Sequence, residues 1–240
     1  MPFDPALVRA AFPGRRIDFY PTIGSTMVAA AAIEEDGAVV IADAQSHGVG
    51  RYSRPWHSAP GDGLYCTVVL RTKPLPALTM AIGLAVQEAI ARCTGLQCDI
   101  RWPNDLLAGD RKCCGILTQG HDDRVLAGIG INVNHEAFPP ELAGIATSLR
   151  LATGRAWARE ALLMEILHRL TPFLQLPVEA VLAAFTQQSS YVRGRRVAVE
   201  LNGTEVRGVT AGLDPHGYLL LDDDQGRRHT ILAGGVRPCS

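Results

Sequence analysis

The chain has 240 residues, of which 47% are hydrophobic and 20% are charged, and its formal net charge is −1. Because domains usually contain roughly 100–200 residues, we expect one large domain or one domain with a small addition. This composition excludes a disordered chain, and the balanced charge gives no support to a general polyanion-binding surface.

Neither a membrane span nor a secretory signal is predicted. The most apolar stretch, residues 77–91, contains Gln87 and Glu88 and is shorter than the about 20 apolar residues that a span needs. The N-terminus lacks the charged and then apolar order of a secretory signal. The six cysteines have no metal-ligand spacing, so we expect buried free thiols, as in a cytoplasmic protein.

Residues 1 to about 190 alternate predicted helices and strands. Helical spacing, alanine content or a suitable first-turn proline predicts helices at 25–35, 77–93, 158–174 and from about Pro177. Runs of β-branched residues predict strands at 37–45, 63–71, 98–102, 113–119 and 124–133. Ser25 and Thr26 are suitable N-caps for the first helix.

Beyond Tyr191 the sequence changes to short strands separated by turns. Asn202 and Gly203 predict a hairpin turn, and further turns that contain glycine follow. About fifty residues of this kind predict a small SH3-like β-barrel. We therefore expect an α+β fold, in which residues 1–190 form a mixed β-sheet with packed helices and residues 191–240 form the barrel.

A long loop, "SHGVGRYSRPWHSAPGDGLY" (46–65), carries glycines that resemble a nucleotide-binding fingerprint. A dinucleotide-binding loop is excluded, because a strand follows the glycines and Ser53 stands at the third glycine position. Arg51 and Arg54 can pair with phosphates or carboxylates through two hydrogen bonds each. The loop is either a lid that orders on a ligand or a solvated basic loop.

Two further stretches carry polar residues beside strands. In "RWPND" (101–105), Asn104 and Asp105 are ordinary turn residues or ligand-binding ones, and Lys112 enters the next predicted strand. In "GIGINVN" (128–134), glycines interrupt an apolar strand. Such glycines mark either the close approach of a ligand or a bulge.

Taken together and in this order, these segments resemble the biotin protein ligases. The matching motifs are "GSTM" (24–27), "QSHGVGRYSRPWHS" (45–58), "RWPND" (101–105), "KCCGIL" (112–117), "GIGINVN" (128–134) and "ATSL" (146–149). The first motif begins at residue 24, so the resemblance implies a short form without the N-terminal DNA-binding domain of some members. Val49 stands where the family usually has arginine; valine is tolerable if that position acts through its backbone, and activity is reduced if the side chain holds a phosphate.

The resemblance implies a fold like that of the class II synthetases and biotin ligases, and an ATP-dependent ligase activity. Biotin would be activated as biotinyl-5′-AMP with release of diphosphate. The biotinyl group would then pass to a lysine of a biotin carboxyl carrier protein, such as a subunit of acetyl-CoA carboxylase. ATP with Mg²⁺ and biotin are the implied small molecules.

The resemblance also implies roles for individual residues, with Lys112 and Arg51 as the catalytic ones. The implied biotin contacts are Ser25, Thr26, Met27, Gln45, Gly48, Val49, Gly50, Arg51, Lys112, Gly115 and Gly128. The implied ATP or adenylate contacts are Arg51, Arg54, Trp56, Asn104, Asp105 and Asn132. Asp105 is the one expected Mg²⁺ contact, and Trp56 is expected to anchor the loop by packing.

Two alternatives stay open from the sequence. One is a lipoate–protein ligase or acyltransferase of the same fold, and the other is a biotin-binding relative without catalysis. We expect contact with a carrier protein, biotin and ATP, no contact with DNA or membranes, a monomer or weak homodimer, and a cytoplasmic location.

Overall fold

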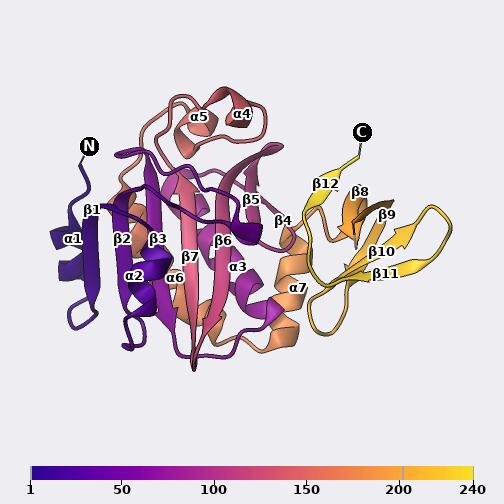
Figure 1. Cartoon of the computed structure of the whole chain (residues 1–240), viewed down its shortest axis with the longest axis horizontal. Helices are drawn as coiled ribbons and strands as arrows, with labels where there is room; N and C mark the ends of the chain where they lie inside the picture. Colours follow the sequence, from indigo (N-terminus) through magenta and orange to yellow (C-terminus); the bar gives the residue numbers. More distant parts are fainter. Residues whose placement is uncertain (1, 202, 240) are drawn as a thin grey trace.

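A seven-stranded mixed sheet forms the larger part of the molecule (Figure 1). The structure is a computed structural model that describes residues 2–201 and 203–239. Strands follow one another across the sheet in the order β1-β2-β3-β7-β6-β5-β4, with β1 and β2 parallel and the other neighbours antiparallel. Their bounds are β1 Ile17–Ile23, β2 Val39–Gln45, β3 Gly63–Leu70, β4 Asp99–Arg101, β5 Asp105–Ala108, β6 Arg111–His121 and β7 Arg124–Asn132.

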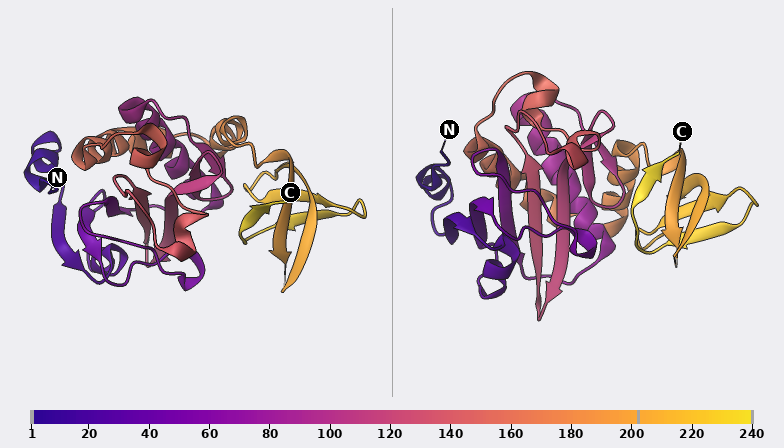
Figure 2. Two further views of the ribbon diagram at one scale, coloured as in Figure 1. Left: turned by 90° about the horizontal axis from the view of Figure 1, so that it is seen from above. Right: turned by 45° about the horizontal axis from the view of Figure 1, so that its top comes forward.

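Helices cover both faces of this sheet, as the view from above shows (Figure 2). Helices α3 and α6 pack on one face and α2 on the other. The helices are α1 Pro5–Ala11, α2 Thr26–Ala31, α3 Pro76–Thr94, α4 Pro140–Ala143, α5 Leu149–Thr153, α6 Arg159–Leu174 and α7 Val178–Gln188, with a 3₁₀ turn at Arg51–Ser53. No helix among the described residues is both long and apolar enough to cross a membrane.

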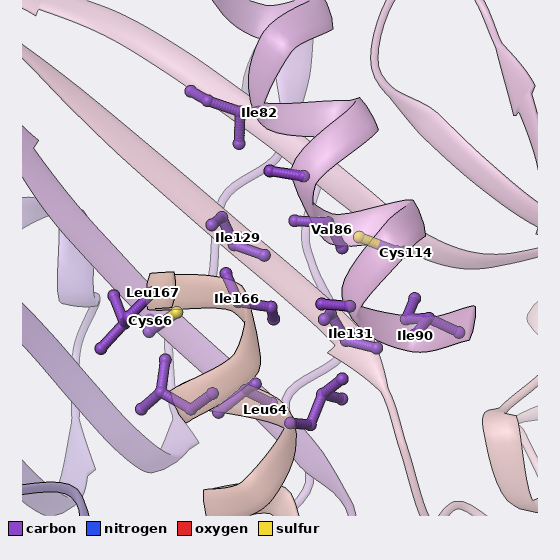
Figure 3. Packing of buried hydrophobic residues seen from close by; sticks show 14 of the residues in the cluster. Leu64, Cys66, Ile82, Val86, Ile90, Cys114, Ile129, Ile131, Ile166 and Leu167 are labelled. Carbon is purple, nitrogen blue, oxygen red and sulfur yellow. The ribbon is translucent and has the colours of Figure 1, made fainter. Parts of the chain in front are cut away.

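The central strand β3 is buried along its whole length because both of its faces are covered. Leu64 and Cys66 point toward α3 and α6 (Figure 3). On this face they share a buried cluster with residues such as Ile129 of the neighbouring strand β7. Thr67 and Val69, on the opposite face, lie toward α2. Since side chains alternate along a strand, this explains a run of residues that is apolar except for Thr67, in place of an apolar–polar alternation.

A second, five-stranded antiparallel sheet follows α7, as expected for the SH3-like module. Its strands are β8 Arg193–Leu201, β9 Thr204–Leu213, β10 Leu219–Asp223, β11 Arg228–Ile231 and β12 Val236–Pro238. Val197 and Leu221 of this sheet share one buried cluster with Met80 of α3 and Phe185 of α7. Trp102 spans the two parts, because its indole Nε1 donates a hydrogen bond to the carbonyl of Gly217 at 3.0 Å. The turn predicted at Asn202 lies outside the described residues.

The structure confirms the predicted succession of elements and corrects some bounds. Helix α2 ends at Ala31, four residues earlier than predicted, because Ile33 turns into the core and Gly37 takes a left-handed φ of 77°. Strand β1 was not predicted, since Pro21 interrupts its pattern; the strand lies at the sheet edge, where proline is tolerated. Strand β5 was also not predicted, because its first residues resemble a turn.

Candidate active site

A cavity of about 300 Å³ lies between the long loop, the start of α2 and the glycine-bearing strands β6 and β7. The predicted site residues that line it are Ser25, Thr26, Met27, Gln45, Val49, Gly50, Arg51, Arg54, Trp56, Asn104, Asp105, Lys112, Gly115, Gly128 and Asn132. Segments that are far apart in the sequence therefore meet at one place in the fold.

Gly48 is the one predicted site residue that does not line this cavity. A Cβ atom on Gly48 would lie 2.7 Å from both Ser58 Oγ and the carbonyl oxygen of Trp56. The backbone N–H of Trp56 donates to the carbonyl of Gly48 at 2.8 Å. Gly48 therefore allows the two arms of the loop to approach each other.

The floor of the cavity is a strip of glycines on β6 and β7. Gly115 and Gly130 are directly opposite each other in the sheet. A Cβ on Gly130 would lie 2.6 Å from Trp56 Cε2, and one on Gly115 would lie 2.9 Å from Trp56 Cζ3. A Cβ on Gly128 would meet Met27 Sδ at 2.8 Å. The glycines are thus needed for close approach, and Trp56 is anchored on them by packing, as predicted.

Three charged side chains form a compact group at the cavity wall. Lys112 Nζ lies 2.5 Å from Asp105 Oδ1, and Arg101 Nη2 lies 2.8 Å from Asp105 Oδ2. Burial alone would raise the pKa of Asp105, but Lys112 and Arg101 outweigh it and hold that pKa below its ordinary value. Lys112 Nζ also lies 5.1 Å from the centre of the Trp56 ring. The ammonium group is thereby positioned between a carboxylate and an aromatic face.

The carboxylate of Asp105 is the only one among the described residues that line the cavity. No group of three or more histidine, cysteine or acidic residues in the described part of the chain could hold a metal ion. Mg²⁺ in nucleotide sites is held largely by phosphate oxygens and water, with one or two protein carboxylates. Both oxygens of Asp105 already have cationic partners, Lys112 and Arg101, so the Mg²⁺ contact expected of Asp105 stays a prediction.

Arg51 is held by two different parts of the chain. Its Nη1 donates to Asn104 Oδ1 at 3.0 Å and to the carbonyl of Gly234, in the C-terminal sheet region, at 3.4 Å. Asn104 in turn donates through Nδ2 to the carbonyl of Ile116 at 2.9 Å. Asn104 therefore uses its carbonyl oxygen to position the arginine.

The tip of the loop has an unusual backbone. Tyr52 and Ser53 have φ values of 58° and 56°, in the left-handed region that favours glycine. The guanidinium carbons of Arg51 and Arg54 lie 5.1 and 5.9 Å from the centre of the Tyr52 ring. Both arginines that were predicted to bind phosphate thus lie over the ring of Tyr52.

Asn132 lies at the end of β7 and fixes the backbone around Lys112. Its Nδ2 donates to the carbonyl of Thr147 at 3.0 Å. Thr147 N donates to the carbonyl of Lys112, and Lys112 N donates to the carbonyl of Ile145, both at 2.9 Å. The Asn132 side chain already has a structural partner, and its predicted nucleotide contact stays a prediction.

Sequence reasoning missed several lining residues. They are Tyr52, Pro55, His57, Tyr65, Cys66, Arg101, Ile116, Leu117, Ile129, Gly130, Phe138, Leu142, Ile145, Ala146, Gly234 and Gly235. Gly130 could have been found, because it lies two residues after Gly128 on the same strand face. Phe138 and Leu142 belong to a proline-rich segment without periodicity, so no sequence pattern points to them.

Comparisons with known proteins agree with this geometry. Residues 23–135 match the biotin/lipoate A/B protein ligase family, and residues 193–236 match the biotin protein ligase C-terminal domain. The bifunctional ligase/repressor BirA of Bacillus subtilis is 37% identical over 240 residues, which cover 89% of this chain and 71% of that protein. The biotin–[acetyl-CoA-carboxylase] ligase of Mycobacterium tuberculosis is 32% identical over 248 residues, covering 96% and 91%.

The fold is also similar to that of solved biotin protein ligases. The Aquifex aeolicus enzyme, in complex with biotin and ATP, superposes with a TM-score of 0.85 at 29% identity and covers 93% of this chain and 99% of its own. The sequence relatives, the second sheet and the converging site residues agree, and the chain belongs to the biotin protein ligase family.

Proposed function

We propose that this protein activates biotin with ATP to form biotinyl-5′-AMP and diphosphate, and then transfers the biotinyl group to a lysine of a biotin carboxyl carrier protein. The acetyl-CoA carboxylase carrier subunit is the acceptor that the names of the relatives support. The observation that carries the proposal is the convergence of Lys112 and Arg51 on one cavity above a floor of glycines.

The first step needs fixed positive charge, because the carboxylate of biotin and the α-phosphate of ATP are both anionic. Lys112 supplies an ammonium group whose position is set by Asp105 and by the ring of Trp56. Held in place before the reaction, such a charge stabilises the developing negative charge without reorganisation. Arg51 supplies a second cation from the loop.

The residues that would bind biotin lie at the end of the cavity next to α2 and β2. Thr26 and Gln45 offer polar groups at the start of α2 and the end of β2, and both line the cavity. Met27 and the glycine floor offer the apolar surface that an alkyl chain and a thioether ring need. Val49 lines the cavity, and its aliphatic side chain has no donor that could hold a phosphate.

A lipoate ligase of the same fold is the second candidate, because residues 23–135 match a family that includes both activities. The match of residues 193–236 to a biotin protein ligase domain favours biotin. Incubation with MgATP and a purified carrier domain, with either biotin or lipoate, separates them by the mass gained on the carrier. We expect the biotin adduct only; a lipoyl adduct alone, or no adduct with biotin, would contradict the proposal.

The proposal also includes the division of labour along the chain. Residues 1–190 would bind biotin and ATP, and residues 191–240 would form the C-terminal β domain. The absence of DNA and membrane contact and the monomeric or weakly dimeric state stay predictions. The cytoplasmic location is supported by cysteines that are all free thiols, four of them buried.

A further inference from the structure

A continuous chain of hydrogen bonds runs from the interior of β3 to the base of the loop. Thr67 Oγ1 donates to Thr26 Oγ1 at 2.9 Å, and Thr26 Oγ1 donates to Gln45 Oε1 at 3.1 Å. Gln45 Nε2 donates to Ser58 Oγ at 3.0 Å, and Ser58 Oγ donates to the carbonyl of Trp56 at 3.1 Å. Thr67 is fully buried, Ser58 is 8% exposed, and neither lines the cavity.

The donors and acceptors along this chain of hydrogen bonds can be arranged in only one direction. The backbone N–H of Thr26, which can only donate, lies 2.8 Å from Gln45 Oε1. The carbonyl of Trp56, which can only accept, takes the hydroxyl hydrogen of Ser58. The Ser58 oxygen is thereby left as an acceptor, so the amide group of Gln45 must face it with Nε2. Ser58 thus fixes which way round the Gln45 amide lies.

The same chain of hydrogen bonds determines which group of Gln45 remains free to bind a ligand. Its Oε1 already accepts two hydrogen bonds from Thr26, and one of its two Nε2 hydrogens is used by Ser58. One amide hydrogen remains for an acceptor atom. A rotated amide would present an oxygen to that acceptor and an N–H to the Thr26 N–H, and both contacts would be unfavourable.

We propose that Ser58 and Thr67 are positioning residues for biotin binding, which they support by orienting the side chains of Gln45 and Thr26. The inference rests on the proposed function, in which Thr26 and Gln45 hold the polar ring of biotin. Ser58 acts on the amide of Gln45, and Thr67 acts on the hydroxyl of Thr26. The chain of hydrogen bonds ends on the carbonyl of Trp56, whose ring packs beside Lys112. It therefore also links the biotin end of the cavity to Trp56, the residue that anchors the loop.

The test measures biotin affinity by calorimetry without ATP, and separately the KM for ATP and the melting temperature. Ser58→Ala and Thr67→Val each remove one hydroxyl and should raise the Kd for biotin about tenfold, while the KM for ATP changes less than about twofold. Thr67→Ser keeps the hydroxyl and should retain biotin affinity within about twofold.

A matched control removes a hydroxyl from another paired threonine. Thr210, in β9 of the second sheet, is buried and its Oγ1 accepts a hydrogen bond from the backbone N–H of Arg195 at 3.0 Å; it does not line the cavity, so Thr210→Val should leave the Kd for biotin unchanged. Residues that act as a unit have non-additive effects. In a Gln45→Ala background, Ser58→Ala should therefore change the Kd for biotin by less than about twofold.

The outcomes separate positioning from a loss of structure. Wild-type biotin affinity in both Ser58→Ala and Thr67→Val would overturn the inference. So would a parallel weakening of biotin and ATP, or a full effect of Ser58→Ala in the Gln45→Ala background. Failure of the wild type to bind biotin would instead overturn the proposed function on which the inference rests.

Discussion

Lys112 Nζ and Asp105 Oδ1 are 2.5 Å apart, and the side chains of both residues are mostly shielded from solvent. The carboxylate also accepts a hydrogen bond from Arg101. A carboxylate held between two cations keeps its charge and fixes the direction of each partner. The ammonium group of Lys112, which we propose as the catalytic cation, is therefore positioned by Asp105.

Asp105→Asn should lower the rate of adenylation by about tenfold or more, because it leaves two neighbouring cations without a counter-charge. Diphosphate release with biotin and MgATP measures the rate. Asp110→Asn is the matched control, since Asp110 lies in the same hairpin and its side chain is 90% exposed. Unchanged adenylation by Asp105→Asn would mean that the pair does not position Lys112.

Lys112→Gln should reduce adenylation by about 10²–10³, because it removes the cation that would bridge the biotin carboxylate and the α-phosphate. Biotin binding measured without ATP should weaken less than the rate falls, since the charge matters most as the anhydride forms. A Lys112→Gln variant with near-normal adenylation would show that another residue supplies this charge.

Arg51→Gly should weaken biotin binding and let adenylate escape from the cavity. The substitution removes the contacts to Asn104 and Gly234 that tie the loop across the opening. Escaped biotinyl-5′-AMP reacts with lysines of unrelated proteins, so mass spectrometry of a bystander protein should find more biotin than with the wild type. Arg71→Gly, on the exposed segment after β3, is the control. Equal bystander labelling, with adenylate formed by both enzymes, would mean that the loop is not a lid.

Gly130→Ala should destabilise the protein by about 1–3 kcal/mol and displace Trp56, because the added Cβ would lie 2.6 Å from the indole. Urea unfolding measures the stability, and tryptophan fluorescence reports the displaced ring. Gly120→Ala lies in β6 next to Pro74, where the added Cβ would have an ordinary contact at 3.5 Å, and it should be nearly neutral. Equal stability of the two variants would contradict the close packing of Trp56.

His135 should make the fold sensitive to acid. The side chain is 1% exposed, its ring stacks on Phe138 at 4.9 Å, and neither ring nitrogen has a hydrogen-bond partner among the described residues. Burial, opposed by Asp62 and aided by His57, lowers the pKa of His135 to about 4. Because the unfolded chain binds the proton more readily, stability is complete above the ordinary histidine pKa and falls as pH drops toward 4.

Between pH 7.5 and pH 5, this histidine should cost about 2 kcal/mol of unfolding free energy. The measurement is urea unfolding of the wild type and of His135→Phe at both pH values. His135→Phe should lose less stability than the wild type on acidification by about that amount. Identical pH dependence in the two proteins would show that His135 does not titrate in this range.

The sequence predicts most elements and about half of the cavity lining, for identifiable physical reasons. Helix α3 has apolar residues at helical spacing, and β3 and β7 are rich in β-branched residues, so local pattern and tertiary packing agree. Polar site residues such as Gln45 and Lys112 were found through motifs, because few other residue types can make the same contacts with a ligand.

Contacts between distant segments could not be predicted in the same way. The hydrogen bond from Arg51 to Gly234 joins residues that no local pattern relates. The resemblance implies a biotin contact for Gly48, and the structure shows that this glycine lies where the two arms of the loop meet, so the biotin contact stays a prediction. A glycine shows that something comes close, and only the fold shows whether a ligand or the chain itself does so.

The buried cluster that α3 and α7 share with the second sheet has a consequence for protein engineering. Trp102 and Met80 cover Leu221 and Val197 and would be left in water if the chain were cut at residue 190. The last fifty residues therefore cannot serve as an interchangeable cassette between homologous ligases. A chimera would have to import the matching surfaces of α3, α7 and Trp102 together with the sheet, and these positions should vary in concert as such enzymes diverge.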